Sequence, residues 1–308
     1  MLRKKSSIFL KDFRMRGLHQ LVAGAVMISF SAVFVKLANV GPTSSALYRM
    51  LFGGLLLITI TLVSRKKIWY GWKAFYLMVL CGAFFAVDLT LWHRSILFIG
   101  PGLATILANF QVFFLGGFGI IILCEKLTIR YALSVPIGLF GLYLIMGSDW
   151  SALSPDYKLG VLLGLLTALS YSCYLLTLRK LQSLDEDVSP FSAVAIISLS
   201  TSALLAVMMI FEGESFAIPD VESWASLIAY GVIGQVLGWV LISKGITRVA
   251  ASRTGLVLLL QPSLAFIWDI LFFSRPTGHM EILGCIIAIA AIYMGSTANN
   301  KKSERQRS

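Results

Sequence analysis

Apolar runs long enough to cross a lipid bilayer follow one another along nearly the whole chain. A helix of about 20 apolar residues crosses the roughly 30 Å of bilayer hydrocarbon. Such a run must be helical, because its backbone finds no water there to satisfy its hydrogen bonds. Only 13% of the residues are charged, and the mean hydropathy is +0.83, whereas about a quarter of a soluble domain is charged. We therefore predict an all-α polytopic membrane protein.

Ten transmembrane helices are predicted, and they leave no stretch that could form a soluble domain. The spans are Leu18 to Ala38, Ser44 to Val63, Ala74 to Phe98, Gly102 to Leu123, Tyr131 to Gly147, Leu159 to Leu181, Phe191 to Phe211, Ser223 to Ser243, Thr254 to Phe273 and Ile282 to Gly295.

Basic residues set the predicted orientation of the chain. The formal net charge is +11, and a cytoplasmic N-terminus places all but five of the 26 Lys and Arg residues on the inner side. The five are Lys36, Arg49, Arg94, Lys158 and Arg275. By the positive-inside rule we predict an integral protein of the bacterial inner (plasma) membrane with both termini in the cytoplasm. The charge then needs no nucleic-acid partner, and the basic ends can contact anionic lipids.

Similar segments occur in the same order in the two halves of the chain. "SFSAVFVKL" (Ser29 to Leu37) matches "SYSCYLLTL" (Ser170 to Leu178), and "ATILANFQVFF" matches "TGLVLLLQPSL", with Gln111 opposite Gln261. Five spans are an odd number, so the second half enters the membrane from the opposite side. Two inverted five-helix repeats are typical of secondary transporters, whose binding site lies at the repeat interface. Ten helices without a repeat are the alternative.

The predicted organisation follows from the repeat. It comprises a basic cytoplasmic segment (1–17), a first repeat of spans one to five (18–148), an outer linker (149–158), a second repeat of spans six to ten (159–296) and a basic cytoplasmic tail (297–308).

The chain resembles the drug/metabolite transporter superfamily, and within it the EamA-like ten-helix transporters. The resembling segments are "SFSAVFVKLANVGPTSSALYRMLFGGLLL", "LATILANFQVFFLGGFGIIILCEKLT" and "RVAASRTGLVLLLQP". The resemblance covers both halves and implies a carrier of small metabolites without naming the substrate. The family usually ends the fourth and ninth spans with Glu. Glu125 does so here, but the second half has "FFSRPTG" with Arg275 near that position, which puts a symmetric gating role of this glutamate in doubt.

Asp88 and Asp269 are the acidic residues well inside predicted spans. A charge at that depth is costly, so each needs a partner or a polar cavity. Asp88 shares a helix face with Trp92, four residues later. Either it lies on a central pathway, where it carries a coupling proton or pairs with a substrate amino group, or it locks two helices by hydrogen bonds. For Asp269 the locking role is favoured, with Arg275 or Lys36 as partner.

Lys36, Arg49 and Arg94 lie near the outer ends of the first three predicted spans. We expect Arg94 to extend to the membrane interface, as long basic side chains do. For Lys36 and Arg49 the resemblance, which places basic residues at these positions, makes a role in the pathway or the outer gate an equal alternative. Together with two acids they would hold both ends of a zwitterion, so an amino-acid-like substrate is predicted.

Amide and aromatic side chains complete the candidate pathway. The predicted pathway residues are Asp88, Trp92, Asn109, Gln111, Gln261, Asp269, Lys36, Arg49, Tyr171 and Trp239, and Tyr174, Gln235 and Trp268 lie at comparable depths. A buried amide must find partners, which favours a lining role for the amides. Each aromatic residue has ordinary helix packing as its alternative. His93 is interpreted as a hydrogen-bonded packing residue.

Known enzyme patterns are missing from the sequence, which has no H-E-x-x-H, G-x-S-x-G or P-loop. Three histidines and four scattered cysteines assemble no metal site. No catalytic residue, metal or cofactor is therefore predicted. We predict a secondary transporter of small polar metabolites, foremost amino acids or related compounds, working by alternating access and driven by protons or by exchange. A membrane-embedded enzyme or a channel is the alternative, and the transporter is a monomer or a homodimer.

Overall fold

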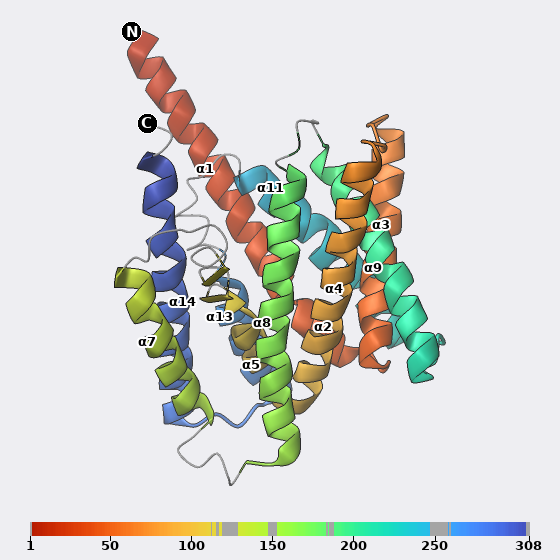
Figure 1. The fold of residues 1–308 in the computed structure, drawn as a ribbon, viewed down its shortest axis with the longest axis vertical. Coiled ribbons are helices and arrows are strands. Elements are labelled where there is room, and N and C mark those ends of the chain that lie inside the picture. The colour runs from red at the N-terminus through yellow and green to blue at the C-terminus, as the bar shows by residue number, and fades with distance from the viewer. Residues whose placement is uncertain are drawn as a thin grey trace.

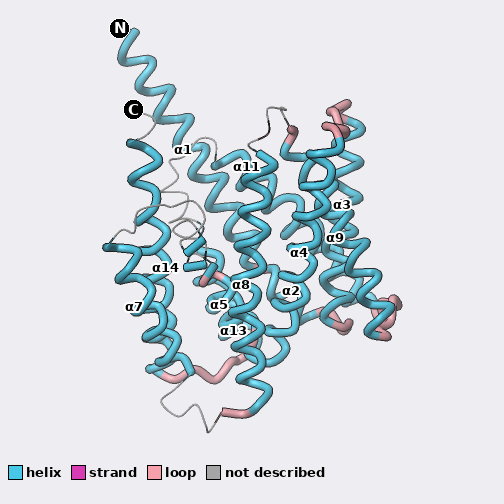
Figure 2. Tube along the Cα trace, in the orientation of Figure 1, coloured by secondary structure: helices cyan, strands magenta, loops and turns pink. Residues whose placement is uncertain are grey.

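The computed structural model describes residues 2–111, 113–114, 117–118, 129–146, 153–182, 184, 188–246, 258 and 260–305. All regular secondary structure within these residues is helical (Figure 2). The all-α class predicted from the sequence is confirmed.

Helices occupy all ten predicted spans, in whole or in part. In the first half they are α1 (Leu2–Ser29), α2 (Ser31–Leu37), α3 (Pro42–Val63), α4 (Trp72–Ile99), α5 (Pro101–Ala108) and α7 (Ile129–Met146). In the second half they are α8 (Pro155–Gln182), α9 (Pro190–Glu212), α10 (Val221–Ala229), the π-helix η2 (Tyr230–Gly238), α11 (Trp239–Ile246), α13 (Leu260–Phe273) and α14 (His279–Arg305). The fourth and ninth spans are described only in part, because residues 119–128 and 247–257, including Glu125, lie outside the described ranges.

Six helices in the described part of the chain are long and apolar enough to cross a membrane. They are Arg16–Leu37, Pro42–Val63, Trp72–Ile99, Pro155–Leu178, Phe191–Glu212 and Val221–Ile242. Three shorter apolar helices, Ile129–Ile145, Leu260–Phe273 and His279–Met294, fall in the predicted fifth, ninth and tenth spans. The chain is an integral membrane protein.

The first span bends at Ser29, where α1 gives way to α2. The Ser29 hydroxyl donates to the Val26 carbonyl at 2.6 Å and accepts from the indole N–H of Trp268 at 2.9 Å. A serine that bonds back to the preceding turn competes with the helix's own hydrogen bonds and bends it. Phe30 at the bend stacks on Trp268, with ring centroids 4.7 Å apart. The bend therefore joins the first span to α13.

Two other spans depart from the α-helix near their middles. α5 begins at Pro101, whose missing N–H suits a first helical turn, and ends in a turn at Asn109. The eighth span passes from α10 through the π-helix η2 into α11, and Tyr230 and Gln235 of η2 are buried. Irregular backbone at membrane depth is tolerated where it is buried in protein or lines a cavity.

Corresponding helices of the two halves pack against one another (Figure 1). The second and seventh spans (α3 and α9), the fourth and ninth (α5 and α13), and the fifth and tenth (α7 and α14) form three such pairs. The packing of α4 on α8 has its counterpart in the packing of η2 and α11 on α1. Each of these packing contacts made by a span of one half therefore has an equivalent made by the corresponding span of the other half, five spans away in the sequence. Two inverted repeats require this symmetry.

The first and last helices reach the same end of the bundle. Figure 1 shows the start of α1 and the finish of α14 together at the top. We call this the terminal end and the opposite one the distal end. α4 runs from Trp72 at the terminal end to Ile99 at the distal end, where α5 begins.

Small residues let the two halves approach closely. Ser95 on α4 donates to the Gly160 carbonyl of α8 at 2.8 Å, and Ser170 on α8 donates to the Phe84 carbonyl of α4 at 2.9 Å. A Cβ on Gly160 would lie 2.6 Å from the Cβ of Phe98. Membrane helices associate through such close packing and hydrogen bonds, because lipid provides no hydrophobic drive between them.

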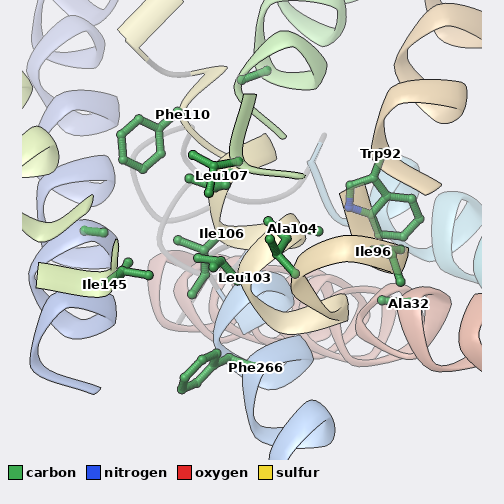
Figure 3. Close-up of a cluster of buried hydrophobic side chains, with 14 of the residues drawn as sticks. Ala32, Trp92, Ile96, Leu103, Ala104, Ile106, Leu107, Phe110, Ile145 and Phe266 are labelled. Carbon is green, nitrogen blue, oxygen red and sulfur yellow. The ribbon is translucent and has the colours of Figure 1, made fainter. Parts of the chain in front are cut away.

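A cluster of buried apolar side chains fills the interface around α5 (Figure 3). Leu103, Ile106 and Leu107 of α5 are completely buried. The distal end of α4 adds Ile96, and the middle of α13 adds Phe266. We call this the α5 cluster. It packs the two halves together on the distal side of the cavity described next.

Candidate binding site

A cavity of about 300 Å³ lies between the two halves, beside the α5 cluster. Helices α1 to α5 of the first half and α8, α11 and α13 of the second contribute to its wall. Ile28, Leu175 and Ile242 line the part that extends toward the terminal end.

Eight of the ten predicted pathway residues line this cavity. They are Arg49, Asp88, Trp92, Asn109, Gln111, Tyr171, Trp239 and Gln261. Gln111 and Gln261, which occupy matching positions in the two halves of the sequence, meet at the same cavity. The approximate two-fold relation between the halves therefore passes close to it.

Asp88 brings a carboxylate to the wall from the middle of α4. Its side chain is only 6% exposed. It makes no hydrogen bond or ion pair with any residue that the structure describes. A charge removed from water is costly unless it is paired, so this carboxylate is suited to receive a proton or a cationic group of a ligand.

Arg49 brings the opposite charge from α3 and is 5% exposed. Its Nε donates to the side-chain oxygen of Gln235 at 3.2 Å, and its Nη1 donates to the Tyr230 hydroxyl at 2.8 Å. Its guanidinium carbon also lies 4.7 Å from the centroid of the Tyr230 ring. The Gln235 amide in turn donates to the Ser198 hydroxyl on α9 at 3.1 Å. Arg49 is therefore held in place by η2.

His93 completes this network. Its Nδ1 lies 2.7 Å from the Leu89 carbonyl oxygen, so we assign the ring hydrogen to Nδ1. Its Nε2 lies 3.4 Å from the Tyr230 hydroxyl and is then the acceptor. The Tyr230 hydroxyl thus donates to His93 and accepts from Arg49. The fully buried His93 occupies the kind of hydrogen-bonded packing position that the sequence suggested.

Amide and aromatic groups form much of the remaining wall. Gln111 lines the cavity, and its side-chain oxygen is buried and has no hydrogen-bond partner among the described residues. The side-chain amide of Asn109 donates to the Thr105 carbonyl at 2.8 Å. Tyr171 stacks on Tyr174, with centroids 5.6 Å apart. The ring of Tyr171 therefore contacts the cavity with its orientation fixed by packing.

The structure places Lys36 and Asp269 away from the cavity. Asp269 lies eight residues beyond Gln261 on α13, which is about 12 Å farther along the helix. It is 1% exposed and accepts from the Gly102 amide at 3.1 Å and from Arg275 at 3.3 Å. Lys36 is exposed at the end of α2, with its ammonium 4.6 Å from the centroid of the Phe273 ring. These two predicted pathway residues are therefore not among those that line the cavity.

The contacts of Asp269 have the form of the helix lock that the sequence favoured, with Arg275 as its partner. Gly100, between α4 and α5, makes the close approach possible. Its φ of +81° is left-handed, and a Cβ there would lie 2.7 Å from the Asp269 carboxylate. Arg275 also donates to the Glu281 carboxylate at 2.5 Å.

Arg94 is a partly exposed residue near the distal end of α4. It pairs with Glu212, the last residue of α9, which lies beside it at the distal end. The Thr43 hydroxyl donates to the same Glu212 at 2.6 Å. This carboxylate therefore connects α9 of the second half to α3 and α4 of the first.

A third distal connection joins the loop after α2 to the start of α10. The backbone amide of Asn39 donates to the Ser223 hydroxyl at 2.8 Å, and its side chain donates to Asp220 at 3.2 Å. Asp220 caps α10 by accepting from the Ser223 amide at 2.7 Å. These hydrogen bonds, that of the Ser223 amide first, hold the pKa of the Asp220 carboxyl below its ordinary value. We call the three connections, made by Arg275, Glu212 and Asn39, the distal contacts.

Tyr230 is a candidate functional residue that was not predicted from the sequence. Gln235 was predicted only as an amide at a suitable depth. The signal present in the sequence is their spacing of five residues. Five residues span about 140° around an α-helix, so the two would not share a face. The π-helix that brings them together is not predicted by the hydrophobic pattern.

Metal-ligating groups do not gather in the part of the chain that the structure describes. No three His, Cys, Asp or Glu residues there could hold a metal ion together. Cys81, Cys173 and Cys285 have free thiols.

Membrane helices in two inverted halves around a polar cavity are the architecture of a membrane transporter. The sequence model of the EamA-like transporter family matches this chain twice, over residues 15–147 and 158–297. The chain belongs to the EamA-like transporter family, within the drug/metabolite transporter superfamily. It is a membrane transporter with small molecules as its substrates and lipids as its surroundings.

Relatives in two organisms have similarly general descriptions. An uncharacterized transporter of Archaeoglobus fulgidus is 24% identical over 175 residues, which cover 56% of this chain and 58%, less than two thirds, of that relative. The uncharacterized transporter YcbK of Bacillus subtilis is 26% identical over 280 residues, which cover 86% of this chain and 88% of YcbK. A crystal structure of 19% sequence identity shares the fold, with a TM-score of 0.64, over 95% of this chain and 99% of that one.

Proposed function

We propose that this transporter is a secondary carrier of small zwitterionic metabolites, amino acids or related compounds. The supporting observation is the relation of Arg49 to Asp88. Both line one cavity, and they are 5% and 6% exposed. No ion pair joins them in the described structure. A ligand with a carboxylate and an ammonium group would pair with both, and each buried charge would gain the partner it lacks.

The size and the remaining wall of the cavity support a compact ligand. A volume of about 300 Å³ is at the lower end for ligand pockets. Trp92, Tyr171 and Trp239 offer apolar surface for a side chain, and Gln111 and Gln261 bring amide groups to the same wall. An amino acid with an apolar side chain fits this combination.

The carrier works by alternating access between the two repeats, 18–148 and 159–296, with the site at their interface. The α5 cluster and the distal contacts close the distal side. The positive-inside rule places both termini in the cytoplasm of a bacterial cell, so the distal end faces outward. The structure then corresponds to a state closed to the outside.

Coupling is assigned to Asp88. Its carboxylate is neutralised either by the ammonium group of a substrate or by a proton, so transport proceeds by exchange of substrates or with a proton gradient. In this proposal the chain is a carrier and not an enzyme, uses no cofactor and acts as a monomer or homodimer. The packed α5 cluster argues against the alternative of a continuously open channel.

Counterflow into liposomes tests this function. Purified protein is reconstituted into liposomes loaded with one unlabelled amino acid, and entry of the same labelled compound is followed for a panel of apolar amino acids, with and without a pH step. We expect entry above that of protein-free liposomes for at least one compound, and its loss in Asp88→Asn. Entry equal to that of protein-free liposomes for the whole panel would contradict the proposed substrate class.

A further inference from the structure

The nine-residue π-helix η2 lies directly behind Arg49. π-helices are rare and are found mostly at functional sites. Their hydrogen bonds join residues five apart, which brings residues i and i+5 to one side of the helix. Tyr230 and Gln235 have this spacing, and both donate or accept hydrogen bonds on the same side, with α3 and α4.

Close contact with α3 keeps this turn of η2 in place. A Cβ on Gly53, one turn after Arg49, would lie 2.5 Å from the side chain of Gln235. A Cβ on Gly231 of η2 would lie 2.9 Å from Phe52. Glycine on both helices thus lets the Gln235 side chain lie across α3 and reach the guanidinium of Arg49.

The guanidinium of Arg49 uses two of its three nitrogens for hydrogen bonds within the described protein. Nε and Nη1 are bound to Gln235 and Tyr230. Nη2 has no hydrogen-bond partner among the residues that the structure describes, and Arg49 lines the cavity. Two of the three nitrogens are therefore bonded to other protein groups, and Nη2 is available to bind a ligand.

The restraint also keeps the two charges of the cavity apart. A free arginine side chain has many rotamers and would turn toward a nearby carboxylate, since pairing lowers the cost of burying both charges. Bound to η2, Arg49 stays beyond ion-pair distance of Asp88 in the described structure. Both charges then remain available to a substrate. Because Arg49 is already oriented, substrate binding does not have to restrict its side chain further.

We propose that Tyr230 and Gln235 are specificity-determining positioning residues that orient Arg49 to bind the carboxylate of the substrate. The inference rests on the proposed function and identifies how that site selects a carboxylate. Without these residues Arg49 pairs with Asp88, and the transporter loses its preference for amino acids over their amides.

The test compares an amino acid with its carboxamide, which keeps the ammonium group and the side chain but lacks the carboxylate. Labelled leucine and phenylalanine are followed in counterflow, with unlabelled leucine, leucinamide, phenylalanine and phenylalaninamide as competitors. The variants are Tyr230→Phe, which keeps the ring over Arg49, and Gln235→Leu. Tyr174→Phe is the matched control, because Tyr174 is also buried, at 4% exposed, but does not line the cavity.

In Tyr230→Phe and in Gln235→Leu we expect the KM for the amino acid to rise about tenfold, the effect of a hydrogen bond to a charged group. Inhibition by the amide should weaken less than the KM rises, because the amide loses only the pairing of its ammonium group with Asp88. The maximal rate should stay near wild type, as should all values for Tyr174→Phe. Thermal unfolding of each purified variant shows whether it is folded.

Two outcomes overturn the inference separately. If folded Tyr230→Phe and Gln235→Leu keep the wild-type preference for the acid over the amide, the positioning role is wrong while the proposed function stands. If the wild-type protein transports neither amino acid and is inhibited by neither, the proposed substrate class fails and the inference fails with it.

Discussion

The guanidinium of Arg275 donates a hydrogen bond to the backbone carbonyl of Ile99 at 2.9 Å. The bond crosses from the loop after α13 in the second half to the end of α4 in the first. In the proposed alternating-access cycle the halves separate at this end, so we expect Arg275, with its bonds to Asp269 and Glu281, to stabilise the closed distal side.

Replacement of Arg275 by Met should therefore open the distal side more often. A cysteine at the buried Ala104 of the α5 cluster, with the four native cysteines replaced by alanine, reports this opening. We expect an impermeant maleimide outside intact cells to label it about tenfold faster in Arg275→Met, since hydrogen bonds to charged groups contribute roughly 1.5 to 3 kcal/mol. Lys36→Met, which removes a charge from the same end but breaks none of the distal contacts, should not change the rate. Equal labelling in both variants would show that Arg275 is not part of the closure.

Asp88 and Asp269 should respond differently to the loss of their charge. Asp88 has no bonding partner among the described residues, so Asp88→Asn should abolish amino-acid transport and leave the unfolding temperature unchanged. Asp269 is paired and buried, so Asp269→Ala removes one of the two carboxylates that pair with Arg275 and the acceptor of the Gly102 amide, and should cost roughly 1.5 to 3 kcal/mol of stability. Thermal unfolding and counterflow of the same preparations check both statements. A strongly destabilised Asp88→Asn would favour the structural role for this residue.

Gly53→Ala should disturb Arg49 indirectly. The added methyl group would lie 2.5 Å from the Gln235 side chain and displace it from the guanidinium. Overpacking of this kind costs about 1 to 3 kcal/mol, and we expect the KM for the amino acid to rise as well. Gly278→Ala is the control, because a Cβ there meets nothing within 4 Å. A wild-type KM in Gly53→Ala would show that Gln235 does not control Arg49.

Much of the fold was predictable because membrane helices follow from simple physical requirements. Length and apolar composition located the spans, and the order of matching segments indicated the inverted halves. The breaks within spans were not predictable in this way. The bend at Ser29 depends on its bond to Trp268, 239 residues away, and η2 depends on contacts with α3 that the hydrophobic pattern does not encode.

For the candidate site, polar residues at membrane depth were the useful signal, since burying them demands a reason. That signal found Asp88, Arg49 and Gln111 at the cavity wall. It could not separate them from Asp269, because the cost of burial is also met by a local partner such as Arg275. Tyr230 escaped notice because a tyrosine inside a span is ordinary packing until its hydroxyl is seen to contact Arg49.

The central claim is that Arg49 and Asp88 together bind a zwitterion, and equilibrium binding of three ligands with one side chain tests it most directly. Leucine carries both charges, 3-methylbutylamine only the ammonium and 4-methylpentanoate only the carboxylate. We expect purified protein to bind leucine at least about tenfold more tightly than either of the others, one charged contact being lost in each. In Asp88→Asn the advantage of leucine over the acid should disappear, and in Arg49→Gln its advantage over the amine. Equal affinity of the wild-type protein for all three ligands would contradict the claim.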